Sequence, residues 1–467
     1  MKKLPKGKYT FKIRLTALCA AVMLAAVSLS GCATSTAIAG GKDFDGIMAA
    51  LKTDLFGSAE QDCQQLSLSL PVRAGFDPIE DKSAYASLSS DTLRSVYEDI
   101  ERNLYQISTE ADEDTGYYVM RYTRLPSELA FDDIYIVKEA VICDHPEAFW
   151  VLSRYDVRNN FHDGNYLVLY SKYSYDQINA AFAEINAATE QILARIPDRA
   201  DEVERETIIH NALVDSITYD IAAAESDDST ADAFNLYGAM VKKQAVCSGY
   251  SYAAKMLLNR VGIESRIVVG MSKDSGHMWN QVKINGNGYH LDITWNDSLT
   301  ESDVLYKRYY YFNLTDELIQ RNHKIGKDFS EMVCEYGDDG SYTTAELYNF
   351  RLEPCTSLEE NYHEKNAAHV SKMDSDDIST ISNRIVDASK TKGEVVYILF
   401  DSGISNDDAE TWLARRQNGN YSALEKSMLN ANKYGIGARV RSFSLVRMFS
   451  DEEPVWPNLY AVRLIYA

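Results

Sequence analysis

Positive charge is scarce in this sequence, and its scarcity excludes one class of partners. Lys and Arg together number 47 against 69 Asp and Glu, which gives a formal net charge of −22 at pH 7. Six of the basic residues fall within the first 14 positions, so the rest of the chain carries a net charge near −28. A nucleic-acid-binding protein needs a basic patch to neutralise phosphates. We therefore predict no nucleic-acid partner.

Zinc motifs are also lacking, and cysteine is sparse. The sequence holds no Cys-x-x-Cys pair and no His-Glu-x-x-His helix, which are common signatures of zinc sites. We therefore predict no metal and no cofactor. Of the seven cysteines, five lie beyond residue 32, and an odd number in an exported protein leaves at least one free thiol. Disulfides among the other four are left open: Cys63, Cys143, Cys334 and Cys355.

The N-terminus has the layout of an export signal. A basic start is followed by an apolar run over residues 15–29, which is too short and too rich in small residues to span a membrane comfortably. The run ends in Leu29-Ser30-Gly31-Cys32, which resembles the bacterial lipoprotein box, whose cysteine is lipidated and becomes the mature N-terminus. A plain secretory signal cut after Ala39 is the alternative. The first interpretation makes residues 1–31 a signal peptide and residues 32–44 a tether. It places the protein on the extracellular face of the bacterial cytoplasmic membrane, anchored at Cys32.

Hydrophobic periodicity divides the remaining chain into four stretches. Residues 45–197 mix helical and alternating patterns and predict an α+β N-terminal region, with strands at 117–122, 135–137 and 165–170. Residues 198–330 hold the chemical motifs. The acidic, Gly-containing sequence at 336–342 suggests a boundary, and residues 331–370 are interpreted as a linker region. Residues 371–467 predict a small α/β C-terminal domain, with one helix over 409–432 and helices on one side of a sheet.

Cys247 is the first residue that suggests chemistry. Small and polar residues surround it in Gln244-Ala245-Val246-Cys247-Ser248-Gly249, and a helical pattern then runs to residue 259. The cysteine is therefore predicted at a helix N-terminus, where the helix dipole favours the thiolate. A thiolate is the form in which a cysteine attacks a substrate.

A histidine and an aspartate follow at short spacing. His277 enters a predicted strand 30 residues after the cysteine, and Asp292 lies on the next strand 15 residues later. A histidine can carry the thiol proton, and an aspartate can orient the histidine. A two-residue turn at Gly286-Asn287 would leave Asp292 about 13 Å along the strand from His277. Unless a longer loop or a bulge shifts the register, Asn296 or Asp297 would be the better partner.

These three motifs resemble the core of the transglutaminase-like superfamily. The resemblance rests on Ala245-Val246-Cys247-Ser248-Gly249-Tyr250, on Gly276-His277-Met278-Trp279-Asn280 and on Tyr289-His290-Leu291-Asp292-Ile293-Thr294-Trp295, in the family's order. His323 fits the usual tail of such domains. The resemblance implies an α+β fold of the papain-like kind, in which a helix-tip cysteine packs on an antiparallel sheet. It also implies that Cys247 is the nucleophile, His277 the general base and acid, and Asp292 the orienting acid.

Other residues near the motifs are secondary candidates. Gln244 is a candidate oxyanion donor, and Trp279 and Trp295 are candidate pocket walls. The expected function is cysteine-dependent acyl transfer through a thioester, most simply hydrolysis of a peptide or amide bond in a peptide or protein substrate that is associated with the cell wall. Two alternatives remain open: a protein-glutamine transglutaminase, and a catalytically silent binding or adhesion module.

Overall fold

A computed structural model describes residues 82–467, apart from residues 128, 161–163, 227, 273–274, 298–304, 330–347 and 449–453. The predicted signal peptide, the tether and the anchor Cys32 lie outside the described residues, as do Cys63 and Cys334. Cys143, Cys247 and Cys355 are free thiols. Among the described helices, none combines the length and the apolar character that a membrane crossing requires.

The described N-terminal part is an antiparallel sheet with helices. The sheet has the order β1-β2-β5-β3, with β4 also paired to β5. Its strands are β1 (Ile107–Ala111), β2 (Tyr118–Met120), β3 (Thr123–Leu125), β4 (Val151–Asn160) and β5 (Gly164–Ser171). The helices are α4 (Ser83–Ser87), α5 (Asp91–Asn103) and α6 (Phe131–Asp144).

One predicted strand in this part is wrong. Residues 135–137 lie inside α6, not in a strand. The short alternation was misleading because Ile134, Val137 and Val141 are buried at helical spacing over a longer window. Asp132 and Asp133 in the first turn also suit a helix N-terminus.

Two capped helices lead into the middle of the molecule. Ser174 caps α7 (Tyr175–Leu193) by accepting from the backbone N–H of Gln177, and Asp201 caps α8 (Glu202–Ser216) by accepting from that of Glu204. The buried faces of both helices join one hydrophobic core that also includes the N-terminal sheet and the middle of the chain. The N-terminal part and the central part are therefore packed as one body.

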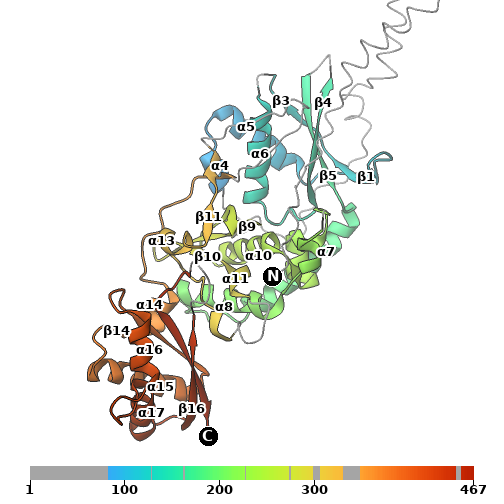
Figure 1. The fold of residues 1–467 in the computed structure, drawn as a ribbon. Coiled ribbons are helices and arrows are strands. Elements are labelled where there is room, and N and C mark those ends of the chain that lie inside the picture. The colour runs from blue at the N-terminus through green and yellow to red at the C-terminus, as the bar shows by residue number, and fades with distance from the viewer. Residues whose placement is uncertain are drawn as a thin grey trace, which may run out of the picture.

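The central part is built on a second antiparallel sheet with the order β10-β9-β8-β11. Its strands are β8 (Ser265–Ser272), β9 (Ser275–Ile284), β10 (Asn287–Leu291) and β11 (His323–Ile325). Helix α10 (Cys247–Arg260) packs against β8 and β9. Figure 1 shows α10 in the middle of the molecule, between the N-terminal sheet and the C-terminal part.

Short elements connect these pieces. The segment before α10 contains β6 (Thr218–Tyr219), α9 (Ile221–Ala224), the 3-10 turn η2 (Asp232–Phe234), the π-helix η3 (Gly238–Lys242) and β7 (Gln244–Ala245). After β10 come α11 (Ile293–Asn296) and α13 (Asp316–Ile319), and β12 (Lys327–Asp328) pairs in parallel with β13 (Tyr348–Asn349).

The register of the β9–β10 hairpin differs from the predicted one. Asn287 pairs with Ile284 and His290 with Gln281, so the turn is Asn285-Gly286, not Gly286-Asn287. Both turn residues have positive φ, 50° and 84°, as a type I′ turn requires. This register advances Asp292 by two positions toward His277, so neither a bulge nor a longer loop is needed to bring the two together.

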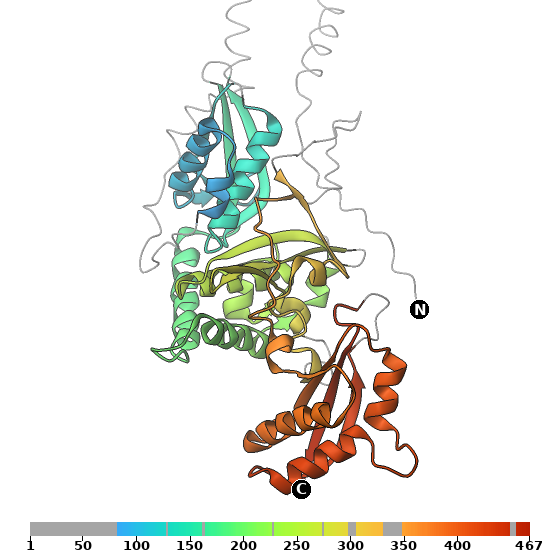
Figure 2. The same cartoon turned by 90° about the vertical axis from the view of Figure 1, so that its left-hand side faces the viewer.

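The C-terminal sheet is covered on both faces. It has the order β14-β15-β17-β16, built from β14 (Ala368–Val370), β15 (Val395–Phe400), β16 (Val440–Arg447) and β17 (Leu459–Tyr466). One face packs against α15 (Ser375–Thr391), α16 (Asn406–Ala414) and α17 (Ala423–Tyr434). The other face presents Tyr397, Leu399 and Ala461 to aromatic residues of the central part. Figure 2 shows the three parts along the length of the molecule, with the central part in the middle.

Two sequence expectations change here. The predicted helix over 409–432 is two helices, because residues 415–422 hold a turn with positive φ at Asn418 and Gly419. The stretch interpreted as a linker contains β14, which pairs in parallel with β15, and α14 (Tyr362–Asn366).

Candidate active site

Cys247 is the first residue of α10, at the tip that faces the η2 turn. The tip is held close to that turn by two hydrogen bonds: Val246 N donates to Ala233 O at 2.9 Å, and the side-chain Oγ of Ser248 donates to Phe234 O at 2.9 Å. Gly249 permits this approach, because a Cβ there would lie 2.7 Å from Ala233 O and 2.8 Å from the Ala245 Cβ. The Cys247 side chain is half-buried at the helix N-terminus, where a negative charge is favoured.

The structure brings His277 and Asp292 together beside this thiol. His277 Nε2 lies 2.7 Å from Asp292 Oδ2, and Cys247 is among the groups that raise the pKa of the same imidazole. Because Nε2 is taken by the carboxylate, Nδ1 is the nitrogen left for the thiol. Asp292 is fully buried and His277 is 8% exposed. The arrangement has the connectivity of a nucleophile, a proton carrier and an orienting acid.

Asp292 is fixed at the junction of a strand and a helix. It follows the last paired residue of β10 and caps α11, with Oδ1 accepting from the backbone N–H of Trp295 at 3.0 Å. Its own N–H donates to Tyr311 O at 3.1 Å. The carboxylate therefore has a defined orientation before any substrate arrives.

The electrostatics favour an ion pair between His277 and Asp292. Burial alone would lower the pKa of His277, but the charge and hydrogen bond of Asp292, together with Cys247, raise it well above the usual value. Burial opposes ionisation of Asp292, and the two histidines beside it lower its pKa well below the usual range. His277 is thus protonated and Asp292 ionised at neutral pH.

A second histidine shares the acid. His323, the first residue of β11, places Nε2 at 3.0 Å from Asp292 Oδ2, the oxygen that also accepts from His277. The sequence associated His323 only with the family resemblance and gave it no role. A lone histidine 31 residues after Asp292, at the start of a short strand, carries no local signal that would reveal the contact.

The two predicted pocket tryptophans flank His277. The Trp279 ring is stacked on the imidazole, with centroids 5.8 Å apart, and Trp295 meets it edge-on at 6.2 Å. The Trp279 indole N–H donates to His290 Nδ1 at 3.0 Å, and His290 Nε2 donates to Asp316 Oδ1 at 2.8 Å. The two rings thus enclose the proton carrier. Gln244 is exposed on β7, and its oxyanion role stays a prediction.

The alternative partners predicted for His277, Asn296 and Asp297, form hydrogen bonds with other residues. Asn296 donates to His210 Nε2 at 3.1 Å and accepts from the N–H of Tyr311. Asp297 accepts a short hydrogen bond from the Tyr250 hydroxyl. The expectation that either would replace Asp292 depended on the predicted hairpin register, and it is wrong because that register is not the one observed.

Two clusters of the described residues bring metal-ligating atoms close together: His277, Asp292 and His323, and His290, Asp316 and Cys355. In the second cluster the Trp279 N–H occupies the lone pair of His290 Nδ1, so the proton sits on Nε2 and no lone pair is left for a metal. In the first, the ionised Asp292 accepts N–H donors from both histidines. The chemistry of these donor sets favours hydrogen-bond networks, not a resident metal.

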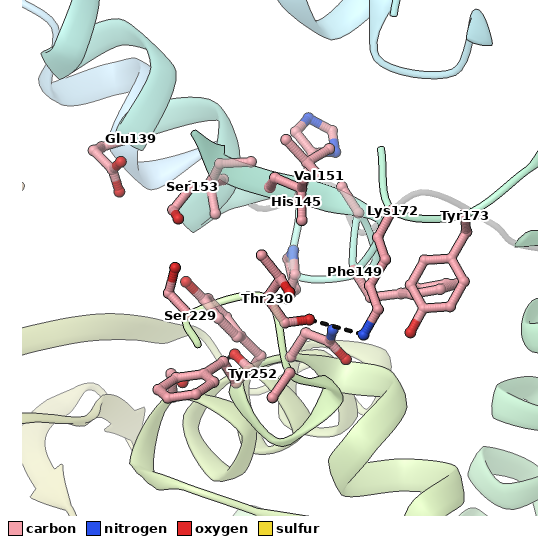
Figure 3. Close-up of a pocket in the computed structure, with 18 of the residues that line it drawn as sticks. Glu139, His145, Phe149, Val151, Ser153, Lys172, Tyr173, Ser229, Thr230 and Tyr252 are labelled. Atoms are coloured by element: carbon pink, nitrogen blue, oxygen red, sulfur yellow. Dashed lines mark hydrogen bonds between the residues drawn. The ribbon is translucent and has the colours of Figure 1, made fainter. Parts of the chain in front are cut away.

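A cavity of about 800 Å³ lies beside the α10 tip. Figure 3 shows that its upper wall comes from the N-terminal part, with Glu139, His145 and Ser153, and its floor from the central part, with Tyr252. Ser248, the neighbour of Cys247, also lines it. Tyr252 lies on α10 five residues after Cys247, and burial raises the pKa of its phenol well above the usual value.

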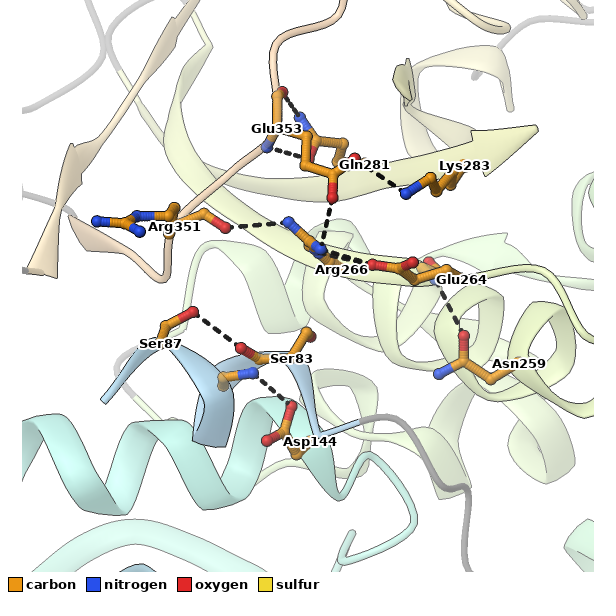
Figure 4. Close-up of polar contacts among 12 residues, drawn as sticks. Ser83, Ser87, Asp144, Asn259, Glu264, Arg266, Gln281, Lys283, Arg351 and Glu353 are labelled. Atoms are coloured by element: carbon orange, nitrogen blue, oxygen red, sulfur yellow. Dashed lines mark hydrogen bonds and ion pairs between the residues drawn. The ribbon is translucent and has the colours of Figure 1, made fainter. Parts of the chain in front are cut away.

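Strand β9 is also held from outside the site. The side-chain amide of Gln281 donates to Glu353 O at 2.7 Å and accepts from Glu353 N at 2.9 Å. Arg266 on β8 contacts Arg351 O and Glu353 Oε1, and Figure 4 shows these contacts beside the ion pair of Arg266 with Glu264. The segment around residue 353 therefore anchors the strand that carries His277.

Part of this core matches a known protein family. The model of the transglutaminase-like superfamily core matches residues 188–293, a range that includes Cys247, His277 and Asp292. No curated protein matches the chain. A solved structure described as a TGase is 15% identical over 38% of this chain and 52% of its own, with a TM-score of 0.24. A candidate cysteine protease from Cytophaga hutchinsonii is 12% identical over 30% of this chain and 61% of its own, with a TM-score of 0.19.

The chain thus spans between half and two thirds of the length of these two structures. The family match begins inside α7 and ends one residue after the acid of the Cys–His–Asp constellation. Residues 188–293 of this chain are therefore a core domain of the transglutaminase-like superfamily.

Proposed function

We propose that this protein is a cysteine-dependent acyl-transfer enzyme that hydrolyses peptide or amide bonds, with Cys247, His277 and Asp292 as its reactive centre. The observation that carries the proposal is that Asp292 holds His277 through a hydrogen bond of 2.7 Å while Cys247 acts electrostatically on the same imidazole. The papain-like arrangement of a helix-tip cysteine on an antiparallel sheet supports the same reaction class.

The proposed reaction has two half-reactions. In the first, the Cys247 thiolate attacks the carbonyl carbon of the amide, a C–S bond forms and the C–N bond breaks, and His277 gives its Nδ1 proton to the leaving amine. In the second, water attacks the thioester while His277 takes a proton from it, a C–O bond forms and the C–S bond breaks. A carboxylic acid remains, and the Cys247 thiolate beside a protonated His277 is restored.

The developing oxyanion needs donors near the helix tip. Backbone N–H groups in the first turn of a helix have no intrahelical partner and carry partial positive charge. The first turn of α10 and the exposed Gln244 amide are the candidate donors.

The cavity beside Cys247 supports a polypeptide substrate. Its walls combine aromatic residues, such as Phe149 and Tyr252, with hydroxyl groups, such as Ser153 and Ser229. Apolar pockets and scattered hydrogen-bonding groups suit a chain with a polar backbone and apolar side chains. We also propose that the substrate is met at the cell surface, with the protein tethered through Cys32, on the strength of the Leu29-Ser30-Gly31-Cys32 motif.

The test is the alkylation rate of Cys247 by iodoacetamide between pH 4 and pH 9, read on the Cys247 peptide by mass spectrometry, in wild type and His277→Ala. If Cys247 and His277 form a thiolate–imidazolium pair, the alkylation rate of wild-type Cys247 stays high down to acidic pH. The alkylation rate of His277→Ala then falls steeply as the pH is lowered. Equal profiles would indicate a binding module without the chemistry. Peptide cleavage and amine incorporation into a glutamine peptide then separate hydrolysis from cross-linking.

A further inference from the structure

We propose that His323 is a positioning residue of the reactive centre: it holds Asp292 through the same carboxylate oxygen that His277 uses, and so sets how tightly His277 keeps its proton. The inference rests on the proposed function, because it concerns the same site.

The geometry is a carboxylate held from three sides. Asp292 Oδ2 lies 2.7 Å from His277 Nε2 and 3.0 Å from His323 Nε2, while Oδ1 accepts from Trp295 N. His323 is 3% exposed and Asp292 fully buried. Three different elements, β9, β11 and α11, therefore meet on one carboxylate that water does not reach.

The shared oxygen determines where the proton of His323 sits. An ionised carboxylate only accepts hydrogen bonds, so His323 Nε2 must carry a proton. The other nitrogen, Nδ1, lies 2.7 Å from Asn322 Oδ1, and Asn322 Nδ2 lies 2.9 Å from the Tyr311 hydroxyl. Burial lowers the pKa of His323, which favours a neutral ring. A half-turn of the Asn322 amide would offer Nδ1 a donor and let the Tyr311 hydroxyl donate to the amide oxygen, with no other movement.

Asp292 Oδ2 accepts from both His277 and His323, so its hydrogen bond to each histidine is weaker than it would be to one histidine alone. The groups that face Asp292 are His277, on which Cys247 also acts, and His323, on which His290 acts. The N–H of His323 takes up part of the negative charge of Asp292. His277 therefore binds its proton less tightly than it would beside an unshared carboxylate, and is a better donor to the leaving amine.

Two substitutions of His323, to leucine and to glutamine, distinguish its proposed hydrogen-bonding role from a role in packing alone. His323→Leu removes the donor, whereas His323→Gln keeps an amide N–H near the position of Nε2. His363→Leu is the matched control, because His363 is also fully buried and its ring nitrogens have no hydrogen-bond partner within the described part of the chain. All three are made in the full chain and checked for folding by circular dichroism.

The readout is the alkaline step in the alkylation profile of Cys247, which appears when His277 loses its proton. We expect His323→Leu to move this step upward by about one pH unit, since a nearby charge shifts a titration by about one to three units. His323→Gln and His363→Leu should follow wild type. An unmoved step in His323→Leu, or an equal shift in His323→Gln, would overturn the proposal.

A second measurement needs no variant at position 323. In the ¹⁵N-histidine-labelled full chain, the Nε2 of His323 should show the chemical shift of a protonated nitrogen from about pH 5 to pH 9, and a lone-pair shift would refute the proposal. A wild type whose Cys247 profile equals that of His277→Ala would instead refute the proposed function, so the two failures can be told apart.

Discussion

Asp292 has the most constrained side chain at the reactive centre. It joins two histidines from different strands and caps α11, and it is fully buried. A buried charge of this kind persists only when it is paired and hydrogen-bonded. The ion pair with His277 is therefore what makes both the ionised acid and the protonated imidazole available at neutral pH.

Asp292→Asn should remove the charge while keeping the cap. The amide oxygen can still accept from Trp295 N, but burial of His277 is no longer opposed, so its pKa should fall. We expect the alkylation rate of Cys247 at pH 6 to drop by about tenfold or more, because the imidazolium partner of the thiolate is lost. An unchanged rate would show that the thiol does not depend on this pair.

The same pair predicts a pH dependence of stability. The folded pKa of His277 is raised, so its contribution is complete below its unfolded value of about 6.5 and declines as pH rises toward the folded value. The folded pKa of Asp292 is lowered, so its contribution is complete above its unfolded value of about 3.9 and declines as pH falls. The difference in free energy of unfolding between wild type and Asp292→Asn, from urea titrations, should be largest between about pH 4 and pH 6.5. A difference that is flat with pH would contradict the pairing.

At the scale of elements, the tip of α10 depends on close backbone approach. Gly249 is the third residue of α10 and faces the η2 segment, and a Cβ there has no room against Ala233 O and the Ala245 Cβ. Both neighbours are held in place, one by the backbone bond from Val246 and the other in the β6–β7 pair.

Gly249→Ala should therefore displace the helix tip. We expect a loss of about 1–3 kcal/mol in the free energy of unfolding from overpacking, with slower alkylation of Cys247 because the thiol moves away from His277. Gly262→Ala is a poor control because its φ is 81°, but Gly276→Ala on β9 has open space for a Cβ and should change stability little. Equal effects at 249 and 276 would show that the crowding is unimportant.

The hairpin shows which part of the element pattern was predictable. The run Asn285-Gly286-Asn287-Gly288 identified a hairpin but offers two turns of similar chemistry. Contacts from remote residues distinguish them: Asn285 N donates to Glu202 and Asn285 Nδ2 to Glu360, while Gly288 faces Cys355 closely. The three site residues, and the place of Cys247 at a helix tip, follow from local pattern and resemblance. The hairpin register and the contact of His323 depend on partners 31 to 83 residues away.

At the scale of the whole molecule, the C-terminal sheet is a wall of the central part. The face of this sheet that α15, α16 and α17 do not cover packs with Trp279, Tyr310 and Tyr311 in one hydrophobic core. Trp456 is 4% exposed in this core and donates from Nε1 to Tyr310 O at 3.1 Å. The tryptophan that stacks on His277 thus belongs to a hydrophobic core that the C-terminal sheet helps to form.

Trp456→Ala should weaken both units. We expect a loss of about 3–5 kcal/mol in the free energy of unfolding, as for other large buried aromatics, and a smaller change in Cys247 alkylation through Trp279. Tyr434→Ala, at a side chain that is 71% exposed on the same C-terminal part, should change stability within about 0.5 kcal/mol. Two separate unfolding transitions with an unaltered central part would contradict this coupling.

The cavity between the N-terminal and central parts gives the last prediction. Ser153 is an exposed residue of β4 that lines the cavity, so Ser153→Trp should fill the cavity and lower peptide turnover severalfold, with alkylation by the small reagent iodoacetamide unchanged. Ser444→Trp, at an exposed position on β16, is the matched control. Turnover that survives Ser153→Trp would place the substrate elsewhere.

The triple attachment of Asp292 affects how relatives of this protein should be interpreted. A chain that lost its catalytic purpose would still need this carboxylate to start α11 and to join β9 to β11. Selection for folding alone would thus preserve Asp292 and both histidines long after any reaction had ceased. Cys247 is half-buried at a helix tip, so selection for folding alone would allow other residues to replace it. The identity of the residue at that one position is therefore the better marker of whether a homologue has kept its chemistry.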